Sequence, residues 1–390
     1  MYKTQKGNHV DPDILSISDL DTPALIVDLD VMERNLSRMA QYCREHDLRL
    51  RPHTKTHKIP ELAHKQIESG ATGITVAKLD EAEVMIDAGL DDLLIAYPIV
   101  GPTKTRRLAD LAQRATITVS LDSETAARGI SAALAERGVQ SSAGGTHSSG
   151  NNVNILVELD VGFGRCGVSN ETEALKLAQT VSSLSGLNFE GLMFFPGHFG
   201  VDPDQRKVLT AQVNELLDRC LNTFAKSHIP LHTISGGSTP SGYESHLLHG
   251  MNETRPGTYI FNDRNTAGVA AASLDDCALS VLVTVVSTSV SGHAAIDGGS
   301  KTFSSDRYQA EDGRGFGLVK DDPAVEIERF SEEHGHLNIV RSEHRYKVGD
   351  RLAVIPNHVC STVNMHDEIY GVRGERVETI WRVAGRGKVH

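Results

Sequence analysis

Residues 79–98 read LDEAEVMIDAGLDDLLIAYP and contain the pattern that decides the fold. The helical pattern LDEAEVMIDAG is followed at once by a short apolar run near residue 92, which is typical of a buried strand. The same alternation recurs along the chain, with strand candidates near residues 48, 73, 92, 116, 154, 190, 232 and 254. Eight strands that alternate with helices predict an α/β fold, a (β/α)8 TIM-type barrel over residues 30–265.

The pattern changes after residue 265. Long β-branched runs divided by turns follow, among them CALSVLVTVVSTSV (277–290), DRLAVIPNH (350–358) and ERVETIWRVAG (375–385). They predict a second, mostly β domain, formed by residues 1–29 plus 266–390. The small-residue stretch SSAGGTHSSGNN (141–152) is expected to be a flexible surface insertion within the barrel.

Charge and hydropathy limit the possible partners. The 390 residues carry a formal net charge of −12, whereas nucleic acid and anionic membranes attract basic surfaces. No apolar run reaches the roughly 18 residues of a membrane span, and the polar start MYKTQKGNHV lacks the apolar centre of a signal peptide. We therefore expect a cytoplasmic protein that acts on a small molecule and binds neither nucleic acid nor membrane.

The five cysteines are Cys43, Cys166, Cys220, Cys277 and Cys360. They are odd in number, widely spaced and without a C-x-x-C pair, so neither a disulfide framework nor a four-thiolate zinc site is expected. Only Cys360 has a local context that suggests a chemical role.

The stretch LRPHTKTHK (50–58) places Lys55 just past the first barrel strand. Active sites of such barrels lie at the C-terminal ends of the strands. A lysine there, with His53, His57 and Lys58 as neighbours, can have a lowered pKa and act as an amine nucleophile toward a carbonyl. The simpler alternative is a solvated basic loop without a chemical role. If the loop is reactive, Lys58 is the other lysine that could supply the amine.

Two glycine-containing turns follow the last two barrel strands, ISGGSTPS (234–241) and TRPGTYIFND (254–263). Glycines let the backbone approach an anion, and loops at these positions commonly hold a phosphate in this barrel. Ser238, Thr239 and Thr258 could donate further hydrogen bonds. A phosphate ester that also carries an aldehyde would engage both these turns and Lys55.

The run VELDVGFGRCG (157–167) imitates a dinucleotide fingerprint, because its glycines spell G-x-G-x-x-G after a strand. The acidic residue that should end the next strand, Glu190, instead precedes it. We therefore interpret the turn as a support for Arg165, which could direct a fixed charge into the barrel mouth.

The β domain contains AVIPNHVCSTVN (353–364). On an extended strand His358 and Cys360 would share a face and could bind one metal ion. Thiolate and imidazole ligands favour zinc, whereas magnesium and manganese prefer oxygen. A buried cysteine beside a polar histidine is the simpler alternative, and His334 and His336 in EEHGHLN (332–338) form a competing pair.

Taken together, DTPALIVDLDVMERNL, RPHTKTHK, GFGRCGV, SGGSTP, RPGTYIFND, DGGSK, EEHGH and PNHVCSTVN resemble the D-serine dehydratase/D-threonine aldolase family. These are metal-activated pyridoxal 5'-phosphate (PLP) enzymes related to alanine racemase. The resemblance covers roughly residues 18–380. It implies a homodimer that acts on a small D-amino acid, with a divalent metal that is zinc, or else Mn2+ or Mg2+.

The resemblance also implies the site residues. Lys55 would be the Schiff-base lysine, and Arg165 would face the pyridine nitrogen. His358 and Cys360 match the metal motif, and His198 in PGHFG is a further catalytic candidate. The cofactor phosphate would be held by the two glycine turns, at Gly237, Ser238, Thr239, Gly257, Thr258 and Tyr259.

Two reactions stay open within the family. Cys360 and LIAYPI resemble the dehydratase branch, so the main prediction is dehydration of D-serine or D-threonine to a 2-oxo acid and ammonia. The continuation CSTVN resembles the aldolase branch, in which a base such as His198 promotes cleavage to glycine and an aldehyde. A third alternative is a PLP carrier or regulatory protein without turnover, although a complete H-x-C pair argues against it.

Overall fold

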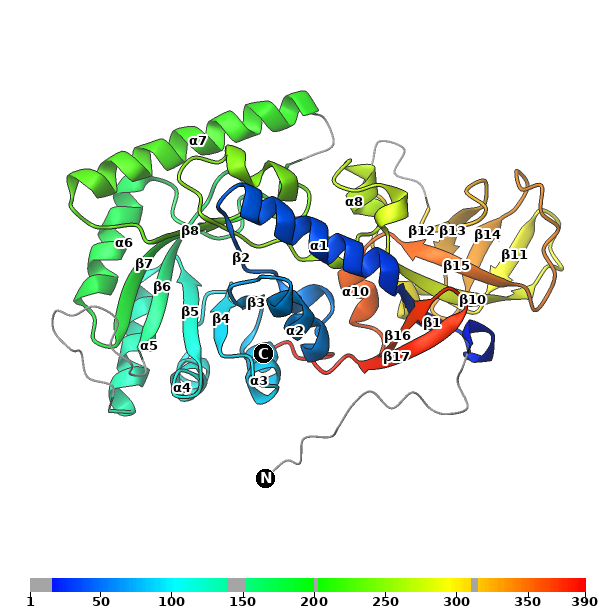
Figure 1. Ribbon diagram of the computed structural model, residues 1–390, viewed down its shortest axis with the longest axis horizontal. Helices are drawn as coiled ribbons and strands as arrows, with labels where there is room; N and C mark the ends of the chain where they lie inside the picture. The colour runs from blue at the N-terminus through cyan, green and yellow to red at the C-terminus, as the bar shows by residue number, and fades with distance from the viewer. Residues whose placement is uncertain (1–15, 139–151, 200–202, 310–314) are drawn as a thin grey trace. The chain divides into compact units, whose positions relative to one another are not determined.

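The computed structural model describes residues 16–138, 152–199, 203–309 and 315–390 (Figure 1). Residues 141–151 of the predicted insertion lie outside the described residues. The chain divides into two compact units. The barrel unit comprises Met39–Lys55, Leu62–Gly257 and Lys388–His390, and the β unit comprises the described parts of Met1–Arg38, Thr56–Glu61 and Thr258–Gly387. The domain boundaries at 30–265 stay a prediction.

The barrel unit is built on eight parallel strands in the order β2-β9-β8-β7-β6-β5-β4-β3. Backbone bonds from Thr72 N to Leu50 O (2.9 Å) and from Thr75 N to Pro52 O (2.8 Å) join the two ends of this order. All eight predicted strands are present, and the predicted (β/α)8 barrel is confirmed. The strands are β2 (Arg49–Leu50), β3 (Ile74–Val76), β4 (Asp92–Ile95), β5 (Thr116–Leu121), β6 (Val153–Leu159), β7 (Leu187–Phe194), β8 (Thr233–Gly236) and β9 (Glu253–Thr254).

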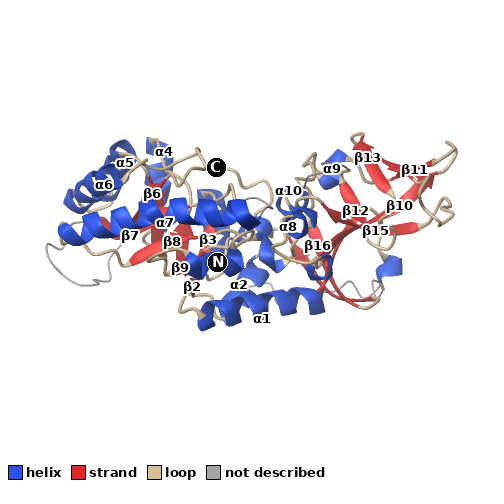
Figure 2. Cartoon of the chain, turned by 90° about the horizontal axis from the view of Figure 1, so that it is seen from above, coloured by secondary structure: helices blue, strands red, loops and turns tan. Residues whose placement is uncertain are grey.

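Helices lie along the outside of these strands (Figure 2). Two of them begin at a side chain that accepts backbone N–H bonds: Ser123 starts α5 and Asn170 starts α6. Their buried faces are rich in alanine, leucine and valine, as the helical spacing predicts. The helices are α2 (Pro60–Glu68), α3 (Leu79–Asp87), α4 (Pro102–Leu111), α5 (Glu124–Glu136), α6 (Glu171–Ser183) and α7 (Pro203–Lys226), with short 3-10 turns η2 (Thr54–Thr56) and η3 (Gly242–Leu247).

The barrel strands bury both apolar and polar groups. Leu94, Leu156 and Met193 form one apolar cluster from β4, β6 and β7. In β8 and β9, by contrast, Ser235 is 0 % exposed and Glu253 is 2 % exposed. Since buried polar groups require partners, these strands must supply hydrogen bonds to each other.

The β unit contains a nine-stranded sheet in the order β11-β14-β13-β12-β15-β10-β1-β16-β17. The N-terminal strand β1 runs antiparallel to β10 and parallel to β16. Its strands are β1 (Ala24–Asp28), β10 (Leu279–Ser287), β11 (His293–Ile296), β12 (Gly317–Val319), β13 (Glu326–Phe330), β14 (Gly335–Asn338), β15 (Arg351–Pro356), β16 (Glu368–Arg373) and β17 (Arg376–Arg382).

Short helices connect the strands of the β unit. They are α8 (Arg264–Gly268), α9 (Ser300–Phe303) and α10 (Val359–Val363), with 3-10 turns η1 (Ile17–Asp19), η4 (Thr258–Ile260) and η5 (Leu274–Asp276); the longer α1 spans Leu29–Glu45. Within the described ranges, no helix combines the length and apolar character needed to cross a membrane.

Candidate active site

Lys55 lies in the η2 turn directly after β2, at the C-terminal end of the barrel. Its side chain is half-buried, and its Nζ lies 5.9 Å from the centre of the Phe195 ring, which follows β7. The backbone N–H of Lys55 donates to His53 Nδ1 over 3.4 Å. The structure therefore places Lys55 among residues from several strand ends of the barrel unit, as barrel active sites require.

The other cations of LRPHTKTHK have structural partners. His53 is buried, and burial, followed by the charges of Lys55, Arg255 and Arg165, lowers its pKa well below the usual value, so it is neutral. In the β unit, His57 is fully buried and its Nδ1 accepts the Ile59 N–H over 3.0 Å. There too, Lys58 Nζ donates to Asn364 Oδ1 over 2.8 Å. Lys58 thus bonds within the β unit, whereas Lys55 lies at the C-terminal end of β2 in the barrel unit, and this position favours Lys55 as the reactive amine.

The glycine turn after β8, residues 236–239, is here called the β8 turn. Gly237 has φ +80°, and a Cβ atom there would lie 2.4 Å from Thr254 Oγ1, so only glycine fits without a shift. Among the described residues, the N–H groups of Gly237 and Ser238 donate to no protein acceptor. Unpaired N–H groups in a buried turn suit an anion such as a phosphate.

Side chains of the predicted phosphate set fall into both units. In the barrel unit, Thr239 Oγ1 accepts the Gly257 N–H over 3.2 Å, which links the two predicted turns. Ser238 Oγ lies 3.1 Å from Ser241 Oγ. In the β unit, Thr258 Oγ1 lies 3.9 Å from Cys360 Sγ, and Tyr259 is buried. Thr258 is therefore also a neighbour of the candidate metal site.

The glycine turn after β6, residues 160–167, is here called the β6 turn. Asp160 Oδ1 accepts the N–H groups of Gly162 and Gly164, each over 3.0 Å, and Asp122 Oδ2 accepts that of Gly167 over 3.0 Å. These N–H groups already donate to carboxylates, and the negative charge of the carboxylates would repel a phosphate. The dinucleotide interpretation therefore finds no support in the turn's geometry.

Arg165 extends from the β6 turn as an exposed side chain. Its guanidinium carbon lies 5.3 Å from the centre of the Phe163 ring and 4.8 Å from that of Phe195, distances that suit cation–π contacts. Arg165 and Lys55 thus share Phe195 as a neighbour. The role of Arg165 opposite a pyridine nitrogen stays a prediction.

Sequence reasoning missed Arg255, a residue of the quoted run TRPGTY. Its side chain is only 5 % exposed. Burial lowers the pKa of its guanidinium to about 10, and the charges of Glu158 and Glu253 oppose this shift. A charged group this deeply buried at a strand end is a candidate for binding a ligand. The signal was its position directly before the second phosphate turn.

His198 follows β7 and is half-buried. Its Nδ1 is buried and has no hydrogen-bond partner among the described residues, and its ring stacks near Phe163 with centroids 6.4 Å apart. Burial lowers the pKa of His198, against the opposing charge of Asp160, so the imidazole is neutral at pH 7. A neutral imidazole is suited to accept a proton, and because Nδ1 is buried, Nε2 is the nitrogen that could receive it.

The predicted extended geometry of His358 and Cys360 is wrong. β15 ends at Pro356, His358 caps the short helix α10, and Cys360 lies in its first turn. The cause is Asp263, a fully buried residue whose Oδ2 accepts the Val359 N–H over 3.1 Å and lies 3.0 Å from His358 Nδ1. Asp263 therefore starts α10 and orients the imidazole, a role the sequence did not reveal.

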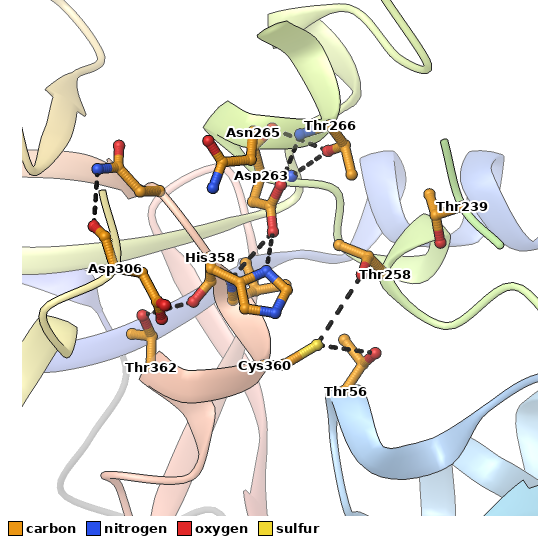
Figure 3. Close-up of polar contacts among 12 residues, drawn as sticks. Thr56, Thr239, Thr258, Asp263, Asn265, Thr266, Asp306, His358, Cys360 and Thr362 are labelled. Carbon is orange, nitrogen blue, oxygen red and sulfur yellow. Dashed lines mark hydrogen bonds and ion pairs between the residues drawn. The ribbon is translucent and has the colours of Figure 1, made fainter. Parts of the chain in front are cut away.

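The two side chains nevertheless interact electrostatically. Figure 3 shows His358 bonded to Asp263, and Cys360 in contact with Thr56 and Thr258. The charge of Cys360, followed by the hydrogen bond that His358 donates to Asp263, raises the pKa of His358 to about 11 despite burial. Cys360 Sγ also lies 3.3 Å from Thr56 Oγ1. Because Nδ1 bonds to Asp263, Nε2 is the nitrogen of His358 that could bind a metal ion in place of its proton.

No group of three histidine, cysteine or carboxylate side chains suited to a metal occurs in the described parts of the chain. A metal ion at His358 and Cys360 would thus have two such ligands and several open positions, which is typical of a catalytic ion. The competing pair lies on a hairpin, where His334 is exposed and His336 Nε2 lies 2.9 Å from Ser331 Oγ. None of the five cysteines forms a disulfide bond.

Comparisons with known proteins agree with this geometry. A family model described as alanine racemase, N-terminal domain, matches residues 27–265, and a putative serine dehydratase domain matches residues 278–372. D-threonine aldolase of Arthrobacter sp is 32% identical over 379 residues, which cover 95% of this chain and 94% of the aldolase. The chain belongs to the D-serine dehydratase/D-threonine aldolase family, which has an alanine racemase-like N-terminal domain.

Two further proteins of the family are informative. The crystal structure of D-threonine aldolase from Filomicrobium marinum has a TM-score of 0.87 and 34% identity, covering 96% of this chain and 98% of that one. D-threo-3-hydroxyaspartate dehydratase of Delftia sp. (strain HT23) is 31% identical over 364 residues, 88% of this chain and 92% of the dehydratase. Solved variants of the dehydratase replace a histidine and a cysteine two positions apart, the latter in a metal-free form.

These findings confirm the predicted family and fold, and they confirm an enzyme of the lyase class. The carrier alternative is not supported. Family members are PLP enzymes, and some depend on a metal ion. For the reaction, the findings support the aldolase alternative better than the main prediction of dehydration.

Proposed function

We propose that the protein is a PLP- and metal-dependent aldolase that cleaves D-3-hydroxy amino acids such as D-threonine to glycine and an aldehyde. The observation that carries this proposal is the neutral, half-buried imidazole of His198, which follows β7 at a strand end of the barrel unit. Cleavage of the Cα–Cβ bond requires a base for the hydroxyl proton. The aldolases among the relatives support the same reaction.

The barrel unit would hold PLP. Lys55 supplies the amine, the N–H groups of Gly237 and Ser238 receive the phosphate, and Arg255 or Arg165 supplies the positive charge beside the ring. The unpaired N–H groups and the positive φ of Gly237 fit a phosphate without rearrangement. When bound, PLP provides an electron sink that stabilises negative charge on Cα.

The protein's own groups would then move protons. His198 accepts the proton of the β-hydroxyl, the Cα–Cβ bond breaks with its electron pair left on Cα, and the aldehyde departs. The protonated amine of Lys55 gives a proton to Cα and completes glycine, and solvent water carries the proton of His198 back to Lys55. His198 is suited to this task because its lowered pKa leaves it unprotonated at neutral pH.

The β unit would hold the metal ion. His358 and Cys360 form the ligand pair, and Asp263 fixes the imidazole tautomer through the contact at Nδ1. A thiolate and an imidazole favour zinc over Mn2+ or Mg2+. A divalent cation held by this pair would supply Lewis acidity beside the hydroxyl group of the substrate.

Dehydration is the second candidate, and Cys360 is the observation that favours it. Solved variants of a D-threo-3-hydroxyaspartate dehydratase replace a histidine and a cysteine with the same two-residue spacing as His358 and Cys360. The homodimer is also a proposal that follows from the family resemblance. Light scattering tests it, since the monomer mass is 42.2 kDa.

The products formed from D-threonine distinguish the two reactions. We expect glycine and acetaldehyde; formation of 2-oxobutanoate and ammonia instead would overturn the aldolase proposal. EDTA should abolish turnover while the absorbance of bound PLP persists, and zinc should restore it. Cys360→Ala should lose metal activation, whereas Cys360→Asp should shift preference toward Mn2+ or Mg2+. Full, chelator-resistant activity of Cys360→Ala would remove the metal from the proposal.

A further inference from the structure

A chain of buried hydrogen bonds crosses the barrel unit from one end to the other. It starts at Asp92, the first residue of β4, whose Oδ1 accepts from Arg51 Nη1 over 2.7 Å. Arg51 Nε donates to Glu253 Oε2 over 2.9 Å, and Ser235 Oγ donates to Glu253 Oε1 over 2.7 Å. Arg255 Nε in turn donates to Ser235 Oγ over 2.9 Å.

Every inner member of this chain is nearly inaccessible to water. The exposed fractions are 8 % for Arg51, 2 % for Glu253, 0 % for Ser235 and 5 % for Arg255. Burial alone would raise the pKa of the Glu253 carboxyl, but the charge and hydrogen bond of Arg51 and the hydrogen bond of Ser235 together lower it. Glu253 is therefore ionised, and both of its oxygens are occupied.

Arg255 ties the end of this chain to three strand ends. Its Nη2 donates to Phe194 O at the end of β7 over 2.6 Å, and its backbone N–H donates to Gly236 O at the end of β8 over 3.0 Å. Arg255 itself follows β9 and comes two residues before Gly257, whose N–H bonds to Thr239. The guanidinium thus joins the strand ends that support the β8 turn and Gly257.

One part of the Arg255 side chain has no protein partner. Its Nη1 donates to no acceptor among the described residues, although the residue is only 5 % exposed. Nη1 is also not among the fully buried unpartnered atoms of the described residues, so a ligand can reach it and accept a charge-assisted hydrogen bond from it. Nε and Nη2 of the same planar guanidinium are held by Ser235 and Phe194. These two hydrogen bonds therefore set the direction in which Nη1 points.

We propose that Glu253 and Ser235 are positioning residues that hold the Arg255 guanidinium, and with it the β8 turn, in the arrangement that binds the phosphate-bearing cofactor. This inference rests on the proposed function. Glu253 would act through charge and through its two hydrogen bonds, and Ser235 would act through its hydroxyl alone. Neither residue touches the cofactor.

The charge of Glu253 affects Arg255 because both acidic and basic groups surround the Arg255 guanidinium. The ionisable groups that act on it or feel its charge come from several elements: Glu158, Glu253, Arg51, Arg165 and His53. Since Glu253 opposes the lowering of the Arg255 pKa by burial, its loss brings deprotonation of Arg255 closer to neutral pH.

The test measures binding of pyridoxamine 5'-phosphate by calorimetry to the full chain stripped of cofactor, from pH 7 to pH 9. This probe forms no bond with Lys55, so lysine titration does not enter. Glu253→Gln keeps the size of the side chain, but an amide can accept from only one of the two donors. We expect about tenfold weaker binding at pH 7, and a ratio to the parent protein that grows by about threefold toward pH 9.

Ser235→Ala leaves both charges and removes the bridging hydroxyl. We expect about threefold weaker binding with a ratio that stays constant with pH. The matched control is Asp276→Asn in the β unit, where a carboxylate bonded to Arg38 (3.1 Å) and Ser273 (2.9 Å) is 8 % exposed. The control should lower the melting temperature and leave binding within about twofold of the parent protein.

Binding by folded Glu253→Gln within about twofold of the parent at every pH would overturn the inference, as would a pH-independent ratio. If Glu253→Gln does not fold, Ser235→Ala decides, and unchanged binding by that variant overturns the inference as well. If the parent protein itself does not bind the probe, the proposed function fails and the inference fails with it. If the parent protein binds the probe and both variants bind it equally well, the inference fails and the proposed function stands.

Discussion

The β6 turn and the β8 turn both follow barrel strands and both contain left-handed glycines, yet they have opposite hydrogen-bonding states. In the β6 turn, Asp160 and Asp122 accept the glycine N–H groups. In the β8 turn, the N–H groups of Gly237 and Ser238 have no acceptor among the described residues. Glycine spacing therefore permits an anion site, whereas the placement of carboxylates decides whether the turn can receive an anion.

The largest expected effect comes from Gly237→Ala. Its Cβ would lie 2.4 Å from Thr254 Oγ1 at φ +80°, so the β8 turn must shift, and we expect PLP affinity to fall by about a hundredfold. Gly164→Ala in the β6 turn is the matched control, because it has a similar φ of +71° and no atom within 4 Å. Equal losses of affinity in both variants, measured by absorbance titration, would contradict the distinction between the turns.

The next effect concerns the stability of the β6 turn. Asp160→Ala removes the acceptor of two N–H groups and should lower the free energy of unfolding by about 1–2 kcal/mol, with PLP affinity nearly unchanged. Asp218→Ala is the control, since Asp218 pairs with His249 at an exposed site. Denaturant unfolding measures both. A loss of cofactor binding in Asp160→Ala that exceeds its loss of stability would place the β6 turn in the phosphate site.

A smaller effect is expected from Ser238→Ala in the β8 turn. Loss of one hydroxyl donor beside the phosphate should weaken PLP binding by about fivefold. Ser169→Ala, next to the β6 turn, removes a hydroxyl that bonds to Glu173 and should leave binding unchanged. If the two serine variants bind PLP equally well, the hydroxyl of Ser238 does not contribute to the site.

The smallest effect is a shift of a pH profile. His198 works as a base when unprotonated, so kcat/KM should rise with pH through its pKa, which burial places below the usual 6.5. The charge of Asp160 raises this pKa, so Asp160→Asn should move the acidic limb to lower pH by a few tenths of a unit. A shift to higher pH would show that another group controls the profile.

The barrel could be predicted because its signal is local and repeated. Most of the strands are short apolar runs bounded by turns, and most are separated by helical patterns along the sequence. The position of Lys55 after β2 followed from that alternation together with the rule that barrel chemistry lies at the C-terminal strand ends.

His358 and Cys360 show where prediction from local sequence fails. VCSTV (359–363) is rich in β-branched residues and predicts a strand, yet it forms α10. Its first N–H is held by Asp263, almost a hundred residues earlier, and Thr362 Oγ1 donates to Phe303 O over 3.0 Å. Arg255 was missed for a similar reason, since its burial depends on Ser235 and Phe194, which come from other strands.

The central claim is that Lys55 holds the cofactor above the β8 turn. Borohydride reduction of the protein purified with PLP, followed by proteolysis and mass spectrometry, tests it directly. We predict a pyridoxyl group on the peptide that contains Lys55, and its disappearance together with the visible absorbance band in Lys55→Ala. A label on Lys58, or a band that persists in Lys55→Ala, would contradict the account.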